Sequence, residues 1–202
     1  MKWLAALLAL LCTAAVPTEA WRWQRTLVRE AQATWGPAAP VAALAAQLEQ
    51  ESGWRSDANS PVGAQGLAQF MPETATWLAL IYPELRPADP YDPRWAIRAQ
   101  VAYMYHLYRR TMPHTDGGFV GCSQYAFTLR AYNGGQGNVL KDRRKATTLG
   151  LNADDWVAVG PVRGARRSDA NHRENKRYPE RVLLVLMPRY AAVAYGEGVT
   201  CE

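Results

Sequence analysis

The sequence predicts a mainly α-helical protein with one folded domain. At 202 residues the chain is long enough for a single domain with a sizeable core. Apolar residues recur with helical spacing in several segments, whereas no alternating run is long enough for a central strand. Hydrophobic residues make up 49% and charged residues 20% of the chain, which is typical of a globular protein.

The first twenty residues have the pattern of an export signal. Lys2 supplies a positive charge, residues 3–16 are apolar, and residues 18–20 offer a cleavage site. The apolar run is shorter than the roughly 20 residues of a membrane-spanning helix. We therefore expect cleavage after Ala20, which leaves residues 21–202 as the catalytic domain; a retained signal anchor is the alternative.

The next helices each begin near a proline, which the first turn of a helix tolerates. One is expected over residues 41–51 and a short one over residues 72–80. After a proline-rich loop, Asp92 and Pro93 form the cap and first turn of a long helix. Its apolar stripe consists of Ile97, Val101, Met104, Tyr105 and Tyr108.

The second half of the chain predicts two more helices. Residues 122–131 form one, which ends at the following glycines. Residues 141–177 are polar and rich in arginine, and we expect them to be irregular and exposed. Residues 181–195 form the last helix, which is interrupted at Pro188 and stopped by Gly196.

Two glutamates near the end of the 41–51 helix differ in their expected surroundings. Glu51 lies seven residues after Leu44, so it falls within about 20° of it on the helix and extends the apolar stripe. Glu49 is expected to point toward the polar side. Desolvation and the negative end of the helix dipole both raise the pKa of Glu51, as a general acid requires. The alternative is a half-buried structural glutamate bonded to a backbone amide.

The segment around Glu51 resembles the signature of the soluble lytic transglycosylases, members of the goose-type lysozyme superfamily. Glu51-Ser52 is followed nine residues later by Ser60, and then by GAQGLAQFMPETA over residues 63–75. The family pattern there is GAxGLMQxMPxTA. Ala68 replaces the usual methionine, a change expected to affect the shape of the sugar groove more than the chemistry.

Three later blocks follow in the order of the family. WAIRAQVAYM begins at Trp95 and has Gln100 where glycine is usual, AYNGGQGNV covers residues 131–139, and ENKRYPERV covers residues 174–182. The resemblance spans about residues 41–195. It implies a lysozyme-like (SLT/goose-type) fold with a substrate cleft.

The resemblance also implies a role for Glu51 as the single acid/base. It would protonate the glycosidic oxygen between N-acetylmuramic acid and N-acetylglucosamine in peptidoglycan. The carboxylate would then take the proton of the muramoyl 6-hydroxyl as that oxygen attacks the anomeric carbon. The product is a 1,6-anhydro sugar, so the second carboxylate of ordinary glycosidases is not needed.

The substrate-binding residues implied by the resemblance are Ser60, Gln69, Tyr132, Asn133, Glu174 and Tyr178. Ser60 and Gln69 would hold the N-acetyl and hydroxyl groups of the sugars. Tyr132 would help to stabilise charge near the acid, and Asn133 would support the same turn. Glu174 would shape the cleft, with a salt bridge to a nearby arginine as the alternative.

The cysteines suit an exported protein. Removal of Cys12 with the signal leaves Cys122 and Cys201, which could form a disulfide that ties the C-terminal tail to the middle of the chain. Two buried thiols are the alternative. The three histidines are scattered, so we expect neither a metal site nor a cofactor.

The chain is basic, with a formal net charge of +5 and a pI of about 9.2. Such a surface suits an anionic polymer, but the arginines of residues 141–177 are not interleaved with aromatic residues, which argues against nucleic acid. This stretch is either a solvated surface or attracted to cell wall or anionic lipid. We expect a monomer that binds peptidoglycan in the periplasm or cell wall, with transient membrane contact through the N-terminal segment.

Other functions remain open on the sequence. A phage endolysin acting in the host periplasm and a bacterial enzyme of wall remodelling or of a secretion apparatus would share these blocks. A water-using muramidase on the same fold would need a base, for which Asp57 is a candidate. A wall-binding protein without activity is the third class, but the joint presence of Glu51, Gln69 and Tyr132 argues against it.

Overall fold

The computed structural model describes residues 15–196 and 198–201, and over these ranges it contains helices and isolated bridges but no strand. The elements are α1 (Thr18–Trp35), α2 (Val41–Ser52), α3 (Pro72–Ile81), η1 (Pro83–Leu85), α4 (Pro93–Arg110), α5 (Ser123–Gly134), α6 (Gln136–Thr148), α7 (Trp156–Val159), α8 (Asp169–Pro179), η2 (Glu180–Leu186) and α9 (Met187–Ala191). The expectation of a mainly α-helical single domain is confirmed.

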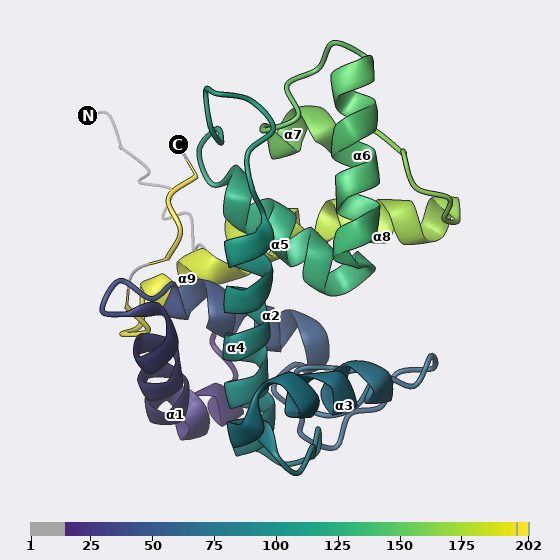
Figure 1. Cartoon of the computed structure of the whole chain (residues 1–202). Coiled ribbons are helices and arrows are strands. Elements are labelled where there is room, and N and C mark those ends of the chain that lie inside the picture. Colours follow the sequence, from purple (N-terminus) through teal and green to yellow (C-terminus); the bar gives the residue numbers. More distant parts are fainter. Residues whose placement is uncertain (1–14, 197, 202) are drawn as a thin grey trace, which may run out of the picture.

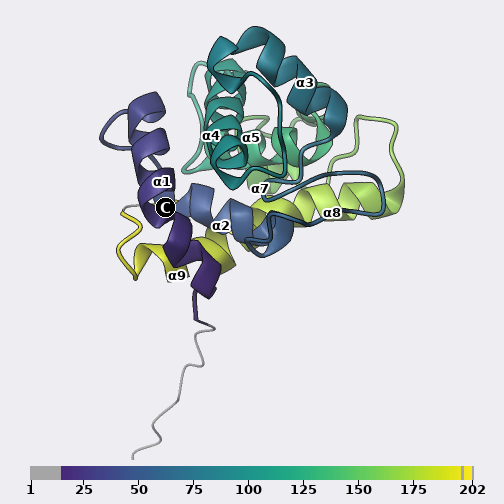
Figure 2. The same cartoon turned by 90° about the horizontal axis from the view of Figure 1, so that it is seen from below.

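Helix α2 is buried between the helices that surround it. It packs against η2 and α9, while α1 packs on α4 and α5 packs on α4, α6 and α8. Figure 1 shows α4 running through the middle of the molecule, between α1 on one side and α3 on the other. Seen from below, α2 and the C-terminal helices lie along one edge of the molecule (Figure 2). Every residue from Val41 to Leu48 is buried. Helix α2 is therefore enclosed on all faces rather than amphipathic.

Residues 141–177 differ from the expectation of an irregular, exposed segment, because α6, α7 and α8 occupy much of it. Arg143 and Asp142 are fully buried. Arg143 forms an ion pair with Asp154, and Asp142 forms ion pairs with Arg130 and Arg167. The sequence cannot show that these charges neutralise one another in the interior, which is the condition for burying them.

The last helix differs from its expected course, because Pro188 lies in the first turn of α9 rather than at a break, and the helix ends at Ala191 rather than at Gly196. Residues Glu180–Leu186 form a π-helical stretch before α9. The wider π-turn accommodates a break in the regular hydrogen-bond pattern, which proline imposes because it has no N–H. The distortion occurs on the segment that packs against α2.

The residues around the proposed cleavage point are packed against the rest of the domain. Residues 1–14 of the expected signal lie outside the described residues, but α1 begins at Thr18 and so includes the proposed cleavage point. Ala20 is fully buried, and its carbonyl accepts a hydrogen bond of 2.6 Å from the hydroxyl of Tyr195. The carbonyl of Ala15 accepts a bond of 2.7 Å from Arg189. In this structure the packed domain therefore starts before residue 21.

Cys122 and Cys201 are joined by a disulfide, with their Cα atoms 4.5 Å apart. Cys122 directly precedes α5, so the bond holds the C-terminal tail against the start of that helix. The two cysteines are 79 residues apart in the sequence. Closing a loop of this length stabilises a fold by about 4–5 kcal/mol in the chain-entropy treatment.

None of the helices in the described part of the chain has the length and apolar character needed to cross a bilayer.

We expect a protein that begins at Val16 to be more stable than one that begins at Trp21. The shorter protein lacks the buried methyl group of Ala20 and leaves the hydroxyl of Tyr195 without its partner, which together cost about 1–3 kcal/mol. Urea unfolding of the two purified proteins measures the difference. Equal free energies of unfolding would show that residues 16–20 do not support the fold.

Candidate active site

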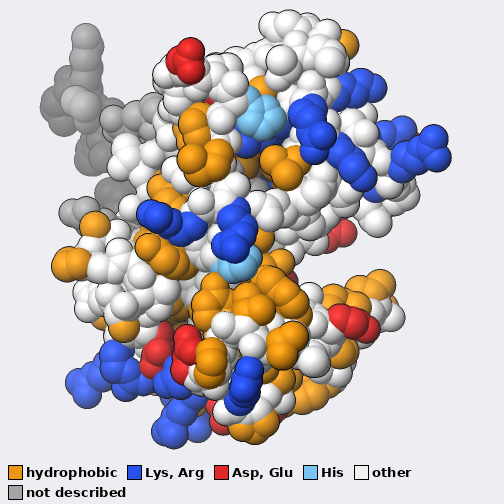
Figure 3. Space-filling view, viewed as in Figure 1, with side chains coloured by type: hydrophobic (Ala, Val, Ile, Leu, Met, Phe, Trp, Pro, Cys, Tyr) orange, Lys and Arg blue, Asp and Glu red, His pale blue; other side chains and the backbone are white. Residues whose placement is uncertain are grey.

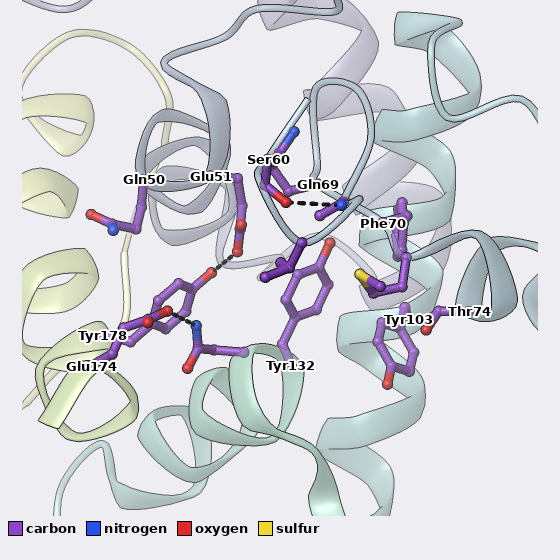
Figure 4. A pocket seen from close by; sticks show the side chains of 14 residues that line it. Gln50, Glu51, Ser60, Gln69, Phe70, Thr74, Tyr103, Tyr132, Glu174 and Tyr178 are labelled. Carbon is purple, nitrogen blue, oxygen red and sulfur yellow. Dashed lines mark hydrogen bonds between the residues drawn. The ribbon is translucent and has the colours of Figure 1, made fainter. Parts of the chain in front are cut away.

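A cleft of about 340 Å³ opens at the C-terminal end of α2. In the space-filling view the molecule is notched between the part that holds α3 and the part that holds α6 and α8 (Figure 3). The lining residues are Gln50, Glu51, Ser60, Val62, Ala64, Gln69, Phe70, Met71, Thr74, Tyr103, Tyr132, Asn133, Glu174 and Tyr178. The structure thus brings the proposed acid and all six proposed substrate-binding residues into one cleft (Figure 4).

Glu51 reaches the cleft because α2 ends there. Gly53 follows the helix with a φ of 63°, a left-handed conformation that favours glycine. The hydroxyl of Ser52 donates to the carbonyl of Leu67 at 2.7 Å and accepts from the amide of Arg55. These bonds hold the loop that follows α2 against the end of the helix. Glu51 therefore lies between the buried part of α2 and this loop.

The surroundings of Glu51 favour its protonated form. Burial raises the pKa of this carboxyl from its ordinary value of 4.5 to about 8, and the negative charge of Glu174 acts in the same direction. A hydrogen bond from the hydroxyl of Tyr178 to Oε1 has a smaller, opposite effect on the pKa. Glu51 is therefore largely protonated at neutral pH. Since Tyr178 occupies Oε1, the proton is available on Oε2.

Glu49 does not point toward a polar surface, so that expectation is wrong. Its carboxylate accepts a bond of 2.9 Å from Arg189 and one of 2.6 Å from the hydroxyl of Tyr190. Tyr190 in turn accepts from the indole of Trp54 at 2.7 Å. Glu49 is not among the residues that line the cleft. It joins α2 to α9, a contact that local sequence cannot reveal because the partners lie about 140 residues away.

Tyr132 is held rigidly at the floor of the cleft. Its hydroxyl donates to the carbonyl of Ala68 at 2.8 Å, and its ring lies 5.3 Å from that of Tyr103 and 5.8 Å from that of Phe70. Burial raises the pKa of Tyr132 well above its usual range, so the hydroxyl stays neutral. Ala68 is fully buried and does not line the cleft. The side chain of Ala68 therefore does not form part of the groove surface.

Ser60 and Gln69 both stabilise the loop that carries them. The Ser60 hydroxyl accepts a bond of 2.9 Å from the amide of Ala64. The Gln69 amide nitrogen donates to the carbonyls of Ala58 and Gly66, at 3.2 and 2.8 Å. This leaves the hydroxyl proton of Ser60 and the Gln69 Oε1 for a ligand.

Gly66 is required by packing as well as by backbone conformation. Its φ is 70°, and a Cβ atom there would lie 1.7 Å from the carbonyl oxygen of Pro90. The loop that holds Ser60 and Gln69 is thus fixed against the segment before α4.

Glu174 belongs to a chain of polar side chains at the rim. Asn133 donates to its Oε1 at 3.1 Å, and Asn175 donates to Asn133 at 3.0 Å. Asn175 also donates to the carbonyl of Arg130 at 2.8 Å and accepts from the Arg130 guanidinium at 3.1 Å. The alternative of a salt bridge is not realised: within the described ranges Glu174 forms none.

Sequence reasoning did not predict several of the residues that line the cleft, although for most of them the sequence contains a feature that could have indicated such a role. Tyr103 lies on α4 outside the apolar stripe, and an aromatic residue on the polar face of a helix could have indicated a binding surface. Phe70 and Met71 are part of the GAQGLAQFMPETA block but had no assigned role. Asn175 does not line the cleft but supports its rim, and its position after Glu174 in a charged helix gives no indication that it is almost completely buried. Asp57, the candidate base, is exposed and does not line the cleft.

Comparisons with known proteins identify the family and the fold of the chain. The model of the transglycosylase SLT domain family matches residues 29–154. The membrane-bound lytic murein transglycosylase F of Pasteurella multocida is 35% identical over 116 residues, which are 57% of this chain and 21% of that protein. The protein of the same name from Haemophilus influenzae is 32% identical over 156 residues, or 77% of this chain and 29% of that protein. The chain thus spans less than a third of the length of these relatives.

Solved structures show the same fold. The 70 kDa soluble lytic transglycosylase of Escherichia coli matches with a TM-score of 0.59 and 26% identity, over 86% of this chain and 24% of that one. An inactive mutant of the lytic transglycosylase Slt of Pseudomonas aeruginosa gives a TM-score of 0.63 with 24% identity, over 87% of this chain and 25% of that one. The expected lysozyme-like fold class is confirmed. Because the family model covers more than half of its residues, the chain belongs to the transglycosylase SLT domain family.

Proposed function

We propose that this protein is a peptidoglycan lytic transglycosylase that cleaves the bond between N-acetylmuramic acid and N-acetylglucosamine. The observation that carries the proposal is the position of Glu51, which lines the cleft with one carboxyl oxygen bonded to Tyr178 and with its pKa raised by burial. The names of the relatives, which are lytic murein transglycosylases, support the same substrate.

The reaction follows from the protonation state of Glu51. Its Oε2–H donates a proton to the glycosidic oxygen, the bond to the anomeric carbon breaks, and N-acetylglucosamine leaves. The Glu51 carboxylate then accepts the proton of the muramoyl 6-hydroxyl while that oxygen bonds to the anomeric carbon. Glu51 ends protonated, the sugar is a 1,6-anhydro ring, and no water is consumed.

Tyr178 and Tyr132 support both steps without exchanging protons. Burial and the nearby charge of Glu51 raise the pKa of each phenol well above its usual range, so both remain hydroxyl donors. Tyr178 stabilises Glu51 when it is a carboxylate, because a hydrogen bond to the charged form is the stronger one. The hydroxyl of Ser60 and the Oε1 of Gln69 can orient the sugar.

Glu174 is the specific reason to keep a water-using muramidase as the second candidate, because it gives the cleft a second carboxylate. Its bond to Asn133 suits a role in shaping the rim. For hydrolysis it would have to activate a water on the opposite face of the sugar.

We further propose that the protein is exported and acts in the periplasm or cell wall, where this substrate lies. The relatives are named membrane-bound, which fits contact of the N-terminal segment with a membrane. A phage lysis enzyme and a bacterial wall enzyme both fit this location.

We expect Glu51→Gln to lower lytic activity on purified sacculi at least a thousandfold, within the range for loss of a general acid. Folding stability at pH 7 should be equal or higher. The folded-state pKa of about 8 exceeds the ordinary value of 4.5, so Glu51 costs stability as pH rises from 4.5 to 8, and Gln removes that cost.

The matched control is Glu49→Gln, which changes a carboxylate on the same helix that does not line the cleft. It should retain activity but lose about 1–3 kcal/mol of stability, because Arg189 loses a charged partner. Wild-type activity of Glu51→Gln would contradict the role of Glu51.

We expect digests to contain muropeptides lighter by one water than the products of a hydrolase. Asp57→Asn should cost less than about tenfold in rate, or 1.4 kcal/mol. Glu174→Gln should lower the rate but still give only anhydro products. Mass spectrometry of digests made in water labelled with heavy oxygen identifies the products, and time courses of the same digests give the rates of the two variants. Reducing ends that carry the label would show that the enzyme is a hydrolase.

A further inference from the structure

A second groove, of about 780 Å³, continues from the catalytic cleft along α8 and η2. Gln50, Glu174 and Tyr178 line both cavities. In the close-up these three residues lie together at one end of the cleft (Figure 4). A ligand in the cleft could therefore extend into this groove without crossing a barrier of protein.

Three arginines characterise this groove, and we call it the arginine groove. Arg173, Arg177 and Arg181 line it at intervals of four residues, which places them along one side of the helix. All three are exposed, and in the described part of the chain none forms an ion pair. The arginines of the neighbouring interior, Arg130 and Arg143, are by contrast paired with aspartates.

The remaining lining gives the arginine groove a mixed character. It includes two carboxylates, Glu174 and Glu180. Together with the three arginines they give the lining a net charge of one positive unit. Glu174 is already bonded to Asn133. Leu184 and Val185, each 54% exposed, add an apolar wall. A ligand that fits this lining carries carboxylates together with small apolar groups.

We propose that the arginine groove binds the acidic stem peptide of the muramoyl residue next to the cleavage site. The proposal rests on the proposed function, because it takes peptidoglycan as the substrate. Each muramic acid carries on its lactyl group a short peptide with free carboxylates and alanyl methyl groups. Guanidinium groups recognise carboxylates through paired hydrogen bonds, and the methyl groups match Leu184 and Val185. A sugar beside Glu51 would direct this peptide past Gln50 and Tyr178.

The test compares two glycan substrates and two matched double variants. The substrates are peptide-bearing glycan strands and the same strands after an amidase has removed the peptides. Arg177→Gln/Arg181→Gln removes two charges from the arginine groove. Arg144→Gln/Lys145→Gln removes two charges from exposed positions on α6, away from the groove lining.

We expect the groove variant to lose about three- to tenfold in kcat/KM on peptide-bearing strands, since exposed ion pairs contribute modestly. On peptide-free strands it should equal the wild type, and the α6 variant should equal the wild type on both. Arg177→Lys/Arg181→Lys should recover part of the loss, because it retains charge but not the paired geometry. Equal losses on both substrates, or no loss on either, would overturn the proposal.

A binding measurement separates failure of this inference from failure of the proposed function. The probe is a muramoyl tripeptide with free carboxylates, titrated into the Glu51→Gln protein, with the fully amidated peptide as its control. Selective binding of the acidic probe that is lost in the groove variant supports the groove even if the wild type cleaves no glycan. Cleavage of both glycans at one rate, with no selective binding, supports the function and overturns the groove.

Vesicles containing anionic lipid test the competing partner. If the groove variant loses vesicle binding while its activity on both glycans is unchanged, the arginines face a lipid surface and the peptide proposal is wrong.

Discussion

The burial of α2 on every face determines both the position and the chemistry of the cleft. Because residues 41–48 are enclosed, the helix can meet solvent only at its last turn, where Glu51 lies. The packed surroundings of the Glu51 carboxyl, which is half-buried at the edge of the cleft, desolvate it and raise its pKa. A fold that exposed one side of α2 would leave Glu51 an ordinary carboxylate. The acid of this site is thus a consequence of core packing rather than of a special partner.

The elements around α2 are held by polar groups that cross long distances in the sequence. Glu49 ties α2 to α9 through Arg189, and Asn175 ties the rim of α8 to α5. Behind this rim, Asp142 joins two arginines in the interior. Breaking one member of such a buried set costs more than the set contributes, because a charge is left without a partner. These contacts therefore fix the cleft's geometry even where their net contribution to stability is small.

Much of the site followed from local sequence, and the remainder depended on contacts that local sequence does not encode. The position of Glu51 on its helix is a local property, but that pattern left a structural glutamate open, and the resemblance of the surrounding motif blocks to the family identified it as the acid. The surroundings of Glu49 could not, because Arg189 and Tyr190 come from the other end of the chain. Residues 141–177 were misjudged for the same reason, since their charges are neutralised in pairs. Helix α1 was missed because the signal pattern appeared to end inside it.

The most direct test is a pH titration of the Glu51 carboxyl. NMR of protein with carboxyl-labelled glutamate monitors this titration in the wild type and in Tyr178→Phe. The wild-type carboxyl should titrate at about pH 8. In Tyr178→Phe its pKa should rise further, because the lost hydrogen bond favours the charged form. A Glu51 that titrates near 4.5 in the folded wild-type protein would contradict the claim that burial of α2 creates the acid.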